Sequence, residues 1–176
     1  VGCGNGFFLK ALCRLGDNRG IGFDPSYVKS KKDDSGGRVR FKKQFYGPQS
    51  ADIACDVVIC RHIIEHISDP LGLLLIIRKA LERSSDARVF FETPCLEWVL
   101  KNQVFWDFFY EHCSYFTKQS LRAAFEIAGF EIESIHKVFQ GQYLWLEAKL
   151  GNKQGRKTSI SPGQIPILTR EFAGKE

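Results

Sequence analysis

The sequence predicts an α/β fold in which a doubly wound, mainly parallel β-sheet ends in an antiparallel C-terminal hairpin. Two observations predict this class. Short β-rich runs alternate with longer segments of helical periodicity up to residue 129, as in parallel strands joined by helices. Two further β-rich runs, 130–139 and 142–150, then follow each other directly. Adjacent strands joined by a short loop pair antiparallel, so these two runs predict the hairpin.

The strands predicted for the parallel part are short and apolar. They cover residues 20–24, 38–41, 55–60 and 87–93. The first helix is predicted over residues 6–15, because Phe8, Leu9, Leu12 and Leu15 recur there at helical spacing.

Two later helices carry recognisable end signals. Asp69 can cap a helix that has Pro70 at its first position and runs to about Arg83. Thr117 can cap the next helix, and Gly129 predicts its C-terminal end. We therefore expect an uninterrupted folded domain over residues 1–150.

After residue 150 the composition changes. The segment 151–176 is rich in Gly, Ser, Lys and Pro, and it holds five basic residues against two acidic ones. This composition predicts a basic linker or tail.

The composition narrows the classes of partner. The 176 residues carry a net charge of +5, with neither a membrane-length apolar run nor a basic stripe with interleaved aromatic residues. The six cysteines form no C-x-x-C pair, which favours free thiols in a reducing compartment. We expect a cytoplasmic protein that binds neither nucleic acid nor a membrane; no pattern indicates an oligomeric state.

A glycine-rich loop opens the chain. Gly2, Gly4 and Gly6 alternate directly before the first helix, where glycine allows positive φ and a helix N-terminus offers free N–H groups. Phe7 occupies the place where a dinucleotide fingerprint needs a small residue, and no P-loop Gly-Lys-Ser/Thr is present. Asp24, at the end of the next strand, can accept hydrogen bonds from ribose hydroxyls.

The glycine loop and Asp24 resemble the first two motifs of class I methyltransferases that use S-adenosylmethionine. The resemblance implies that the loop cradles the amino-acid part of this cofactor and that Asp24 holds its ribose. Arg61 and His62, followed by an E-H-x-x-D-P stretch, continue the resemblance and imply a backbone that packs against the cofactor. The family's central strand would precede Val1, so we expect residues upstream; the absence of methionine, even at residue 1, supports this.

The segment Phe108–Thr117, FFYEHCSYFT, sets an acid and an imidazole among aromatic residues. Burial of an unpaired charge is costly, so the pair serves either as a structural tie of the loop or as part of a pocket. Loops at the carboxyl ends of parallel strands line the ligand crevice, which favours the pocket.

The pattern Y-E-H-x-x-Y-F-T resembles a subgroup related to sugar C-methyltransferases, which implies an acceptor site at Tyr110, Glu111 and His112. Histidine titrates near neutrality, so His112 is the candidate base. Glu111 would orient His112 or hydrogen-bond a hydroxyl group of the acceptor. Tyr110 or Tyr115 would hydrogen-bond the developing oxyanion.

The sequence thus predicts a methyltransferase that acts on a small molecule, with C-methylation of a sugar or keto compound as the form that the resemblance favours. Three alternatives remain open. The first is an O-methyltransferase in which His112 deprotonates a hydroxyl, and the second is a non-catalytic scaffold module with a basic tail. The third is a zinc hydrolase, because His62, Glu65 and His66 spell H-x-x-E-H. Pro70 interrupts the helix that such a site needs, so we expect no metal ion.

Overall fold

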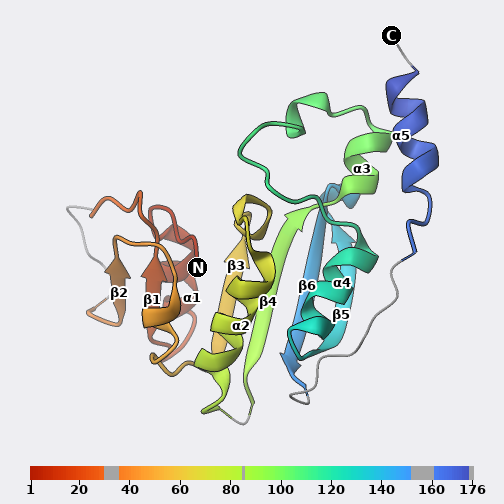
Figure 1. Cartoon of the computed structure of the whole chain (residues 1–176). Helices are drawn as coiled ribbons and strands as arrows, with labels where there is room; N and C mark the ends of the chain where they lie inside the picture. The colour runs from red at the N-terminus through yellow and green to blue at the C-terminus, as the bar shows by residue number, and fades with distance from the viewer. Residues whose placement is uncertain (30–35, 85, 152–160, 175–176) are drawn as a thin grey trace. The chain divides into compact units, whose positions relative to one another are not determined.

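A computed structural model describes residues 1–29, 36–84, 86–151 and 161–174 (Figure 1). The chain forms two compact units, Val1–Ser50 and Ala51–Glu176, and each has its own sheet. Within the described residues, no helix combines the length and the hydropathy that crossing a bilayer requires.

The first unit is a small parallel α/β layer. Its elements are α1 (Phe7–Arg14), β1 (Gly20–Phe23), β2 (Val39–Lys42) and the 3₁₀ turn η1 (Pro48–Ser50). β1 and β2 pair in parallel, with Gly20 opposite Val39. Gly20 has no side chain, which leaves room for Leu9 of α1 to lie directly against β1.

The second unit is a four-stranded mixed sheet with the order β3-β4-β6-β5. Its strands are β3 (Val57–Arg61), β4 (Arg88–Pro94), β5 (Phe130–Val138) and β6 (Tyr143–Leu150). β3 and β4 are parallel, whereas β6 pairs antiparallel with both β4 and β5. The predicted combination of parallel strands and a C-terminal antiparallel hairpin is therefore confirmed.

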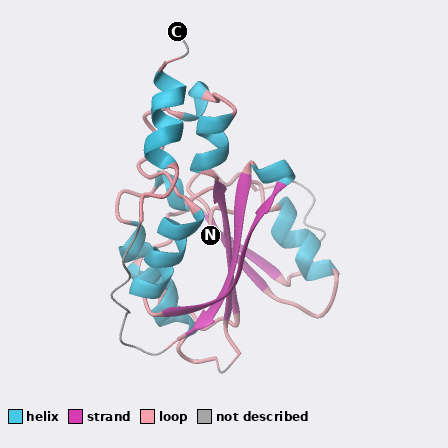
Figure 2. Cartoon of the chain, turned by 90° about the vertical axis from the view of Figure 1, so that its right-hand side faces the viewer, coloured by secondary structure: helices cyan, strands magenta, loops and turns pink. Residues whose placement is uncertain are grey.

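The helical elements of this unit are η2 (Ile64–His66), α2 (Pro70–Leu81), α3 (Leu96–Lys101), η3 (Phe105–Asp107), α4 (Lys118–Ile127), η4 (Phe139–Gly141) and α5 (Ile165–Ala173). α2 and α4 cover one face of the sheet, whereas α3 and α5 lie beyond the ends of the strands (Figures 1 and 2). α2 and α4 lie side by side on the same face. Phe125 of α4 packs edge-on against Phe91 of β4, with ring centroids 4.9 Å apart, so the core lies between these helices and the sheet.

The predicted capping residues are confirmed. The carboxylate of Asp69 accepts a hydrogen bond from the amide of Gly72 at 2.9 Å. Thr117 and Ser120 form a reciprocal capping box at the start of α4. Gly129 follows α4 with a φ of +84°, a conformation that glycine adopts without strain.

The structure adds two helices that the sequence analysis did not predict, α3 and α5. α5 lies inside the segment predicted as a linker or tail, and its Phe172 ring packs against Phe108 with centroids 5.4 Å apart. Four of the five basic residues of that segment lie outside the described residues: Lys153, Arg156, Lys157 and Lys175. The boundary at residue 150 and the role of the tail stay predictions.

Candidate active site

The glycine loop of the first unit is tied to the end of β1. The amides of Gly2 and Cys3 both donate to the carbonyl of Phe23, at 2.9 and 3.1 Å. The amide of Gly4 donates to Oδ2 of Asp24 at 2.8 Å. The loop and the predicted ribose acid therefore form one hydrogen-bonded structure at the carboxyl end of β1.

The three glycines of this loop have positive φ, and a side chain would meet different surroundings at Gly4 and at Gly6. Gly2, Gly4 and Gly6 have φ values of 66°, 51° and 79°. A Cβ on Gly6 would collide with the ring of Phe41, whereas a Cβ on Gly4 would meet no atom within 4 Å. Gly6 thus serves packing within the unit, and the backbone at Gly4 is open to a ligand.

Asp24 is only 9% exposed, yet it is held in the ionised form. Burial raises the pKa of its carboxyl group, but hydrogen bonds from Ser26 and from the Gly4 amide outweigh burial, so the pKa lies below its ordinary value. Ser26 donates from its amide at 2.8 Å and from Oγ at 2.6 Å, both to Oδ1. A carboxylate offers about four acceptor positions, so these three bonds leave capacity for a ribose hydroxyl. The loop and Asp24 fit the predicted cofactor.

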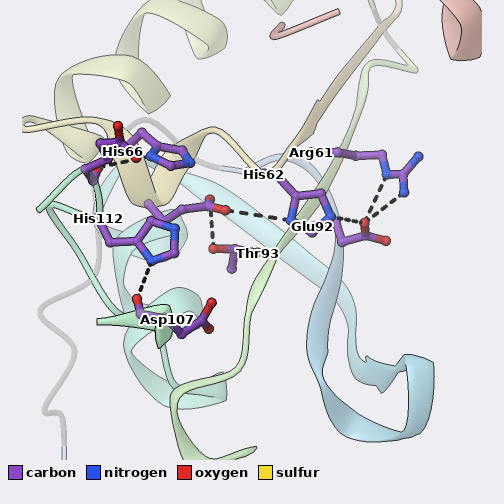
Figure 3. Close-up of polar contacts among 9 residues, drawn as sticks. Arg61, His62, His66, Glu92, Thr93, Asp107 and His112 are labelled. Atoms are coloured by element: carbon purple, nitrogen blue, oxygen red, sulfur yellow. Dashed lines mark hydrogen bonds and ion pairs between the residues drawn. The ribbon is translucent and has the colours of Figure 1, made fainter. Parts of the chain in front are cut away.

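In the second unit, charged side chains gather where β3 and β4 end (Figure 3). Glu92 of β4 is 3% exposed. Its Oε1 accepts two hydrogen bonds from the guanidinium of Arg61, at 3.1 and 2.9 Å, and lies 2.7 Å from Nε2 of His62. Two basic side chains therefore compensate one buried carboxylate.

Glu65 is a second buried carboxylate, 2% exposed, in the 3₁₀ turn that follows β3. Its Oε2 accepts from the hydroxyl of Thr93 at 3.0 Å, and its Oε1 lies 3.7 Å from Nδ1 of His62. Glu65 and Glu92 together raise the pKa of His62, although burial acts in the opposite direction. His62 has a φ of +52°, a conformation that a non-glycine residue keeps only when its surroundings fix it.

The loop between α3 and α4 brings His112 to this cluster. Nδ1 of His112 lies 2.9 Å from the carbonyl of Asp107, and Nδ1 of His66 lies 3.0 Å from the carbonyl of Glu111 (Figure 3). The two imidazole rings are 4.8 Å apart, and the ring of Phe109 lies 4.0 Å from that of His112.

The loop is anchored through its main chain. The amide of Ser114 donates to the carbonyl of Glu65 at 3.0 Å, and the amide of Leu96 donates to the carbonyl of Phe116 at 2.9 Å. Cys95 and Phe116 also form a parallel β-bridge. The C-terminal part of the loop is therefore fixed to the body of the unit by backbone atoms.

The predicted pairing of Glu111 with His112 takes a different form. The ring of His112 is oriented by the Asp107 carbonyl. The carboxylate of Glu111 instead interacts with the phenol of Tyr110 and raises its pKa. Tyr110 is 91% exposed, whereas the Tyr115 ring lies 5.8 Å from that of His112. The backbone turn sends consecutive side chains in different directions, so the acid and the imidazole have separate partners.

The arrangement also bears on the H-x-x-E-H alternative. A zinc-peptidase site needs both histidines on one face of an α-helix. Here η2 is a single 3₁₀ turn that begins at Ile64 and leaves His62 outside. His62 contacts Glu92, whereas His66 contacts His112. The two histidines therefore do not lie on one helical face as the H-x-x-E-H motif requires.

Four residues of this cluster were not among the predicted site residues: Glu65 and His66, which were named in the H-x-x-E-H alternative alone, and Glu92 and Thr93. The sequence carries a further signal for three of them. Glu92 and Thr93 are polar residues at the carboxyl end of an apolar strand, and Glu65 is an acid within an apolar run. Such positions favour a ligand site when the neighbouring strand is known.

With both units described, comparison with known proteins decides the family. A family model described as a methyltransferase domain matches residues 1–135. The chain belongs to this family. The predicted class I fold, the enzyme class and S-adenosylmethionine as the family's cofactor are confirmed, and the sugar C-methyltransferase subgroup stays a prediction.

Solved structures of methyltransferases share the fold. One is the N,N-8-amino-8-demethyl-D-riboflavin dimethyltransferase RosA from Streptomyces davawensis, with a TM-score of 0.69 and 21% identity over 86% of this chain and 48% of that one. Another is a SAM-dependent methyltransferase from Anabaena variabilis, with a TM-score of 0.61 and 18% identity over 85% of this chain and 74% of that one.

A curated relative is the tRNA U34 carboxymethyltransferase of Campylobacter lari. It is 27% identical over 103 residues, which are 55% of this methyltransferase chain and 35% of the relative. The chain thus matches about a third of the curated relative and 48% of RosA.

Proposed function

We propose that this chain transfers a methyl group from S-adenosylmethionine to a small-molecule acceptor, with His112 as the general base. The observation that carries the proposal is the orientation of the His112 ring. A carbonyl can only accept, so the contact with Asp107 requires a proton on Nδ1 and leaves the lone pair on Nε2. That nitrogen is ready to take a proton from an acceptor.

The proposal assigns cofactor binding to the backbone at Gly2, Gly4 and Gly6 and to the carboxylate of Asp24. The cofactor supplies an electrophilic methyl carbon when bound. The cofactor role of Arg61 and His62 stays a prediction from the family resemblance; it concerns their main-chain atoms, because their side chains are engaged with Glu92.

The proton step needs a place for the resulting positive charge. When Nε2 of His112 takes the acceptor's proton, the acceptor's electron pair becomes free to bond to the methyl carbon, whose bond to sulfur breaks. Burial raises the pKa of the Asp107 carboxyl group above its ordinary value, and the nearby His112 partly opposes that rise, so the two groups interact electrostatically. Asp107 therefore stabilises the imidazolium. Tyr110 and Glu111 remain the proposed partners of the acceptor at the outer side of the loop.

For the acceptor, the Y-E-H-x-x-Y-F-T resemblance supports a sugar or keto compound methylated at carbon, with O-methylation of a hydroxyl as the alternative. The name of the Campylobacter relative makes tRNA a class that the test must include. A cytoplasmic location stays a prediction, supported by six free cysteines.

The test is an acceptor screen with methyl-labelled S-adenosylmethionine against sugar nucleotides, keto acids, phenols and total tRNA. We expect label in a small molecule, and a loss of about 10²–10⁴-fold in kcat for His112→Ala without loss of cofactor binding. His136→Ala is the matched control, because His136 is an exposed strand histidine. Label found only in tRNA, or full turnover by His112→Ala, would contradict the proposal.

A further inference from the structure

We infer that Glu65, His66 and His112 form a binding site for a divalent transition-metal ion of the zinc class. One ligand atom from each of the three residues lies within 4.8 Å of the others. The residues come from two segments: Glu65 and His66 from the turn after β3, and His112 from the loop before α4. The site therefore exists only because the chain folds these segments together.

Both imidazoles are oriented as metal ligands are. Nδ1 of His66 and Nδ1 of His112 each contact a backbone carbonyl, at 3.0 and 2.9 Å. Each ring thus carries its proton on Nδ1 and its lone pair on Nε2. A hydrogen bond from the second ring nitrogen to a carbonyl is the usual support of a metal-bound histidine, since it fixes both tautomer and ring direction. Figure 3 shows the two rings next to each other.

The carboxylate completes the set. Glu65 is 2% exposed, and its Oε2 is held by the Thr93 hydroxyl at 3.0 Å. Its main chain is held by Ser114 of the same loop that carries His112. A buried, oriented carboxylate beside two imidazole rings attracts a cation, because the ion would replace solvation that burial has removed.

The ligand types select the kind of ion. Two nitrogens and one oxygen suit zinc or cobalt, whereas magnesium and calcium prefer oxygen alone. Zinc–nitrogen bonds of ~2.0–2.1 Å place ligand atoms roughly 3.3 Å apart, so a ligand–ligand distance of 4.8 Å must shorten by about 1.5 Å. His66 is exposed and can supply this movement. Three protein ligands leave at least one coordination position open.

The site differs from the H-x-x-E-H arrangement, because His62 is not a ligand. Nε2 of His62 lies 2.7 Å from Glu92. In the proposed site, His112 takes the place that His62 has in the H-x-x-E-H motif. The ion would therefore lie between the turn after β3 and the loop before α4, not on a single helix.

The bound ion would regulate the reaction. It would occupy Nε2 of His112, the nitrogen that takes the acceptor's proton. Metal binding and proton abstraction are then mutually exclusive, so zinc should inhibit methyl transfer and a chelator should restore it. This consequence rests on the proposed function, whereas metal binding itself does not.

The experiment titrates the whole metal-free chain with Zn²⁺ by calorimetry and with Co²⁺ by visible absorption. We expect one equivalent to bind, with Co²⁺ giving the absorption of a low-coordinate site. His66→Ala and Glu65→Gln should each weaken binding at least 10-fold, and His136→Ala should bind like the unchanged protein. His66 is exposed, so its loss leaves the fold intact; a melting curve checks Glu65→Gln.

No binding of either ion at 1 mM, or equal binding by His66→Ala and the unchanged chain, would overturn the inference. Binding with the expected variant pattern in a chain that transfers no methyl group would support the site and contradict the proposed function instead. Methyl transfer that persists at saturating Zn²⁺ would refute the regulatory consequence.

Discussion

At the scale of single residues, the structure assigns each buried carboxylate a distinct set of donors. Asp24 is satisfied by backbone and hydroxyl donors, and Glu92 by two basic side chains. Glu65 relies on one hydroxyl and a more distant imidazole. Removal of a donor or an acceptor should therefore cost different amounts at the three positions.

Asp24→Asn should destabilise the protein by about 1–3 kcal/mol at neutral pH, since it weakens charge-assisted hydrogen bonds. The folded-state pKa of Asp24 lies below the ordinary 3.8. The contribution of its charge is therefore fully present above that value and is lost as pH falls through the folded pKa. Urea unfolding from pH 3 to 7 measures this, with the exposed Asp17→Asn as the control. An undiminished difference at the acid end would contradict the assignment.

Glu92→Gln should leave Arg61 and His62 without their shared anion. Breaking a buried pair costs ~3–5 kcal/mol, but Arg61 is about a third exposed, so we expect about 1–3 kcal/mol. Glu131→Gln removes an exposed partner of Lys149 and should cost less than about 0.5 kcal/mol. Chemical denaturation compares the two variants, and equal losses would show that Glu92 acts as a surface charge does.

At the scale of elements, the sequence predicted the helices and strands whose positions are set by local sequence signals. α2 and α4 were predicted because Asp69 and Thr117 cap them, and the strands because short apolar runs mark them. Every predicted element up to residue 150 is confirmed with its ends shifted by at most two residues. α5 was not predicted because its neighbours are rich in Gly, Ser and Pro, and because its packing on Phe108 is a contact between distant segments.

The candidate site likewise contains features set by local sequence signals and features that depend on contacts between distant segments. The glycine loop and Asp24 form a motif that the sequence displays, and His112 was proposed because the motif around it resembles that of known methyltransferases. The contacts of Glu65 with Thr93 and of Arg61 with Glu92 join residues 28 and 31 positions apart. Such contacts depend on the β3–β4 register, which no single segment encodes.

The glycine loop allows a paired prediction. Gly4→Ala should leave the fold nearly intact, at a cost of about 1 kcal/mol for the positive φ, but should weaken binding of S-adenosylhomocysteine. Gly6→Ala should unfold the first unit more readily, because its new Cβ collides with Phe41. Circular dichroism melts and calorimetric titration separate the two effects. The reverse pattern would mean that Gly4 serves packing and Gly6 the ligand.

At the scale of the whole molecule, the chain consists of two compact units whose residues together match one methyltransferase family. A ligand that binds only the native chain stabilises it by mass action. At one hundred times its dissociation constant, S-adenosylhomocysteine should raise the free energy of unfolding by about 2.7 kcal/mol.

A thermal melt with and without S-adenosylhomocysteine checks this expectation. Asp24→Asn should reduce the shift, whereas Asp17→Asn should keep it, because Asp17 is fully exposed. Hydrogen exchange then locates the effect: amides at residues 2–6 should exchange more slowly with the ligand. Equal shifts in both variants would remove Asp24 from the cofactor site.

The loop between α3 and α4 is joined to its surroundings by amides and carbonyls, which every amino acid other than proline supplies. Side-chain substitutions in this loop can therefore leave these backbone contacts intact. Descendants of one ancestral gene can thus vary the side chains of this loop while they inherit an unchanged backbone frame.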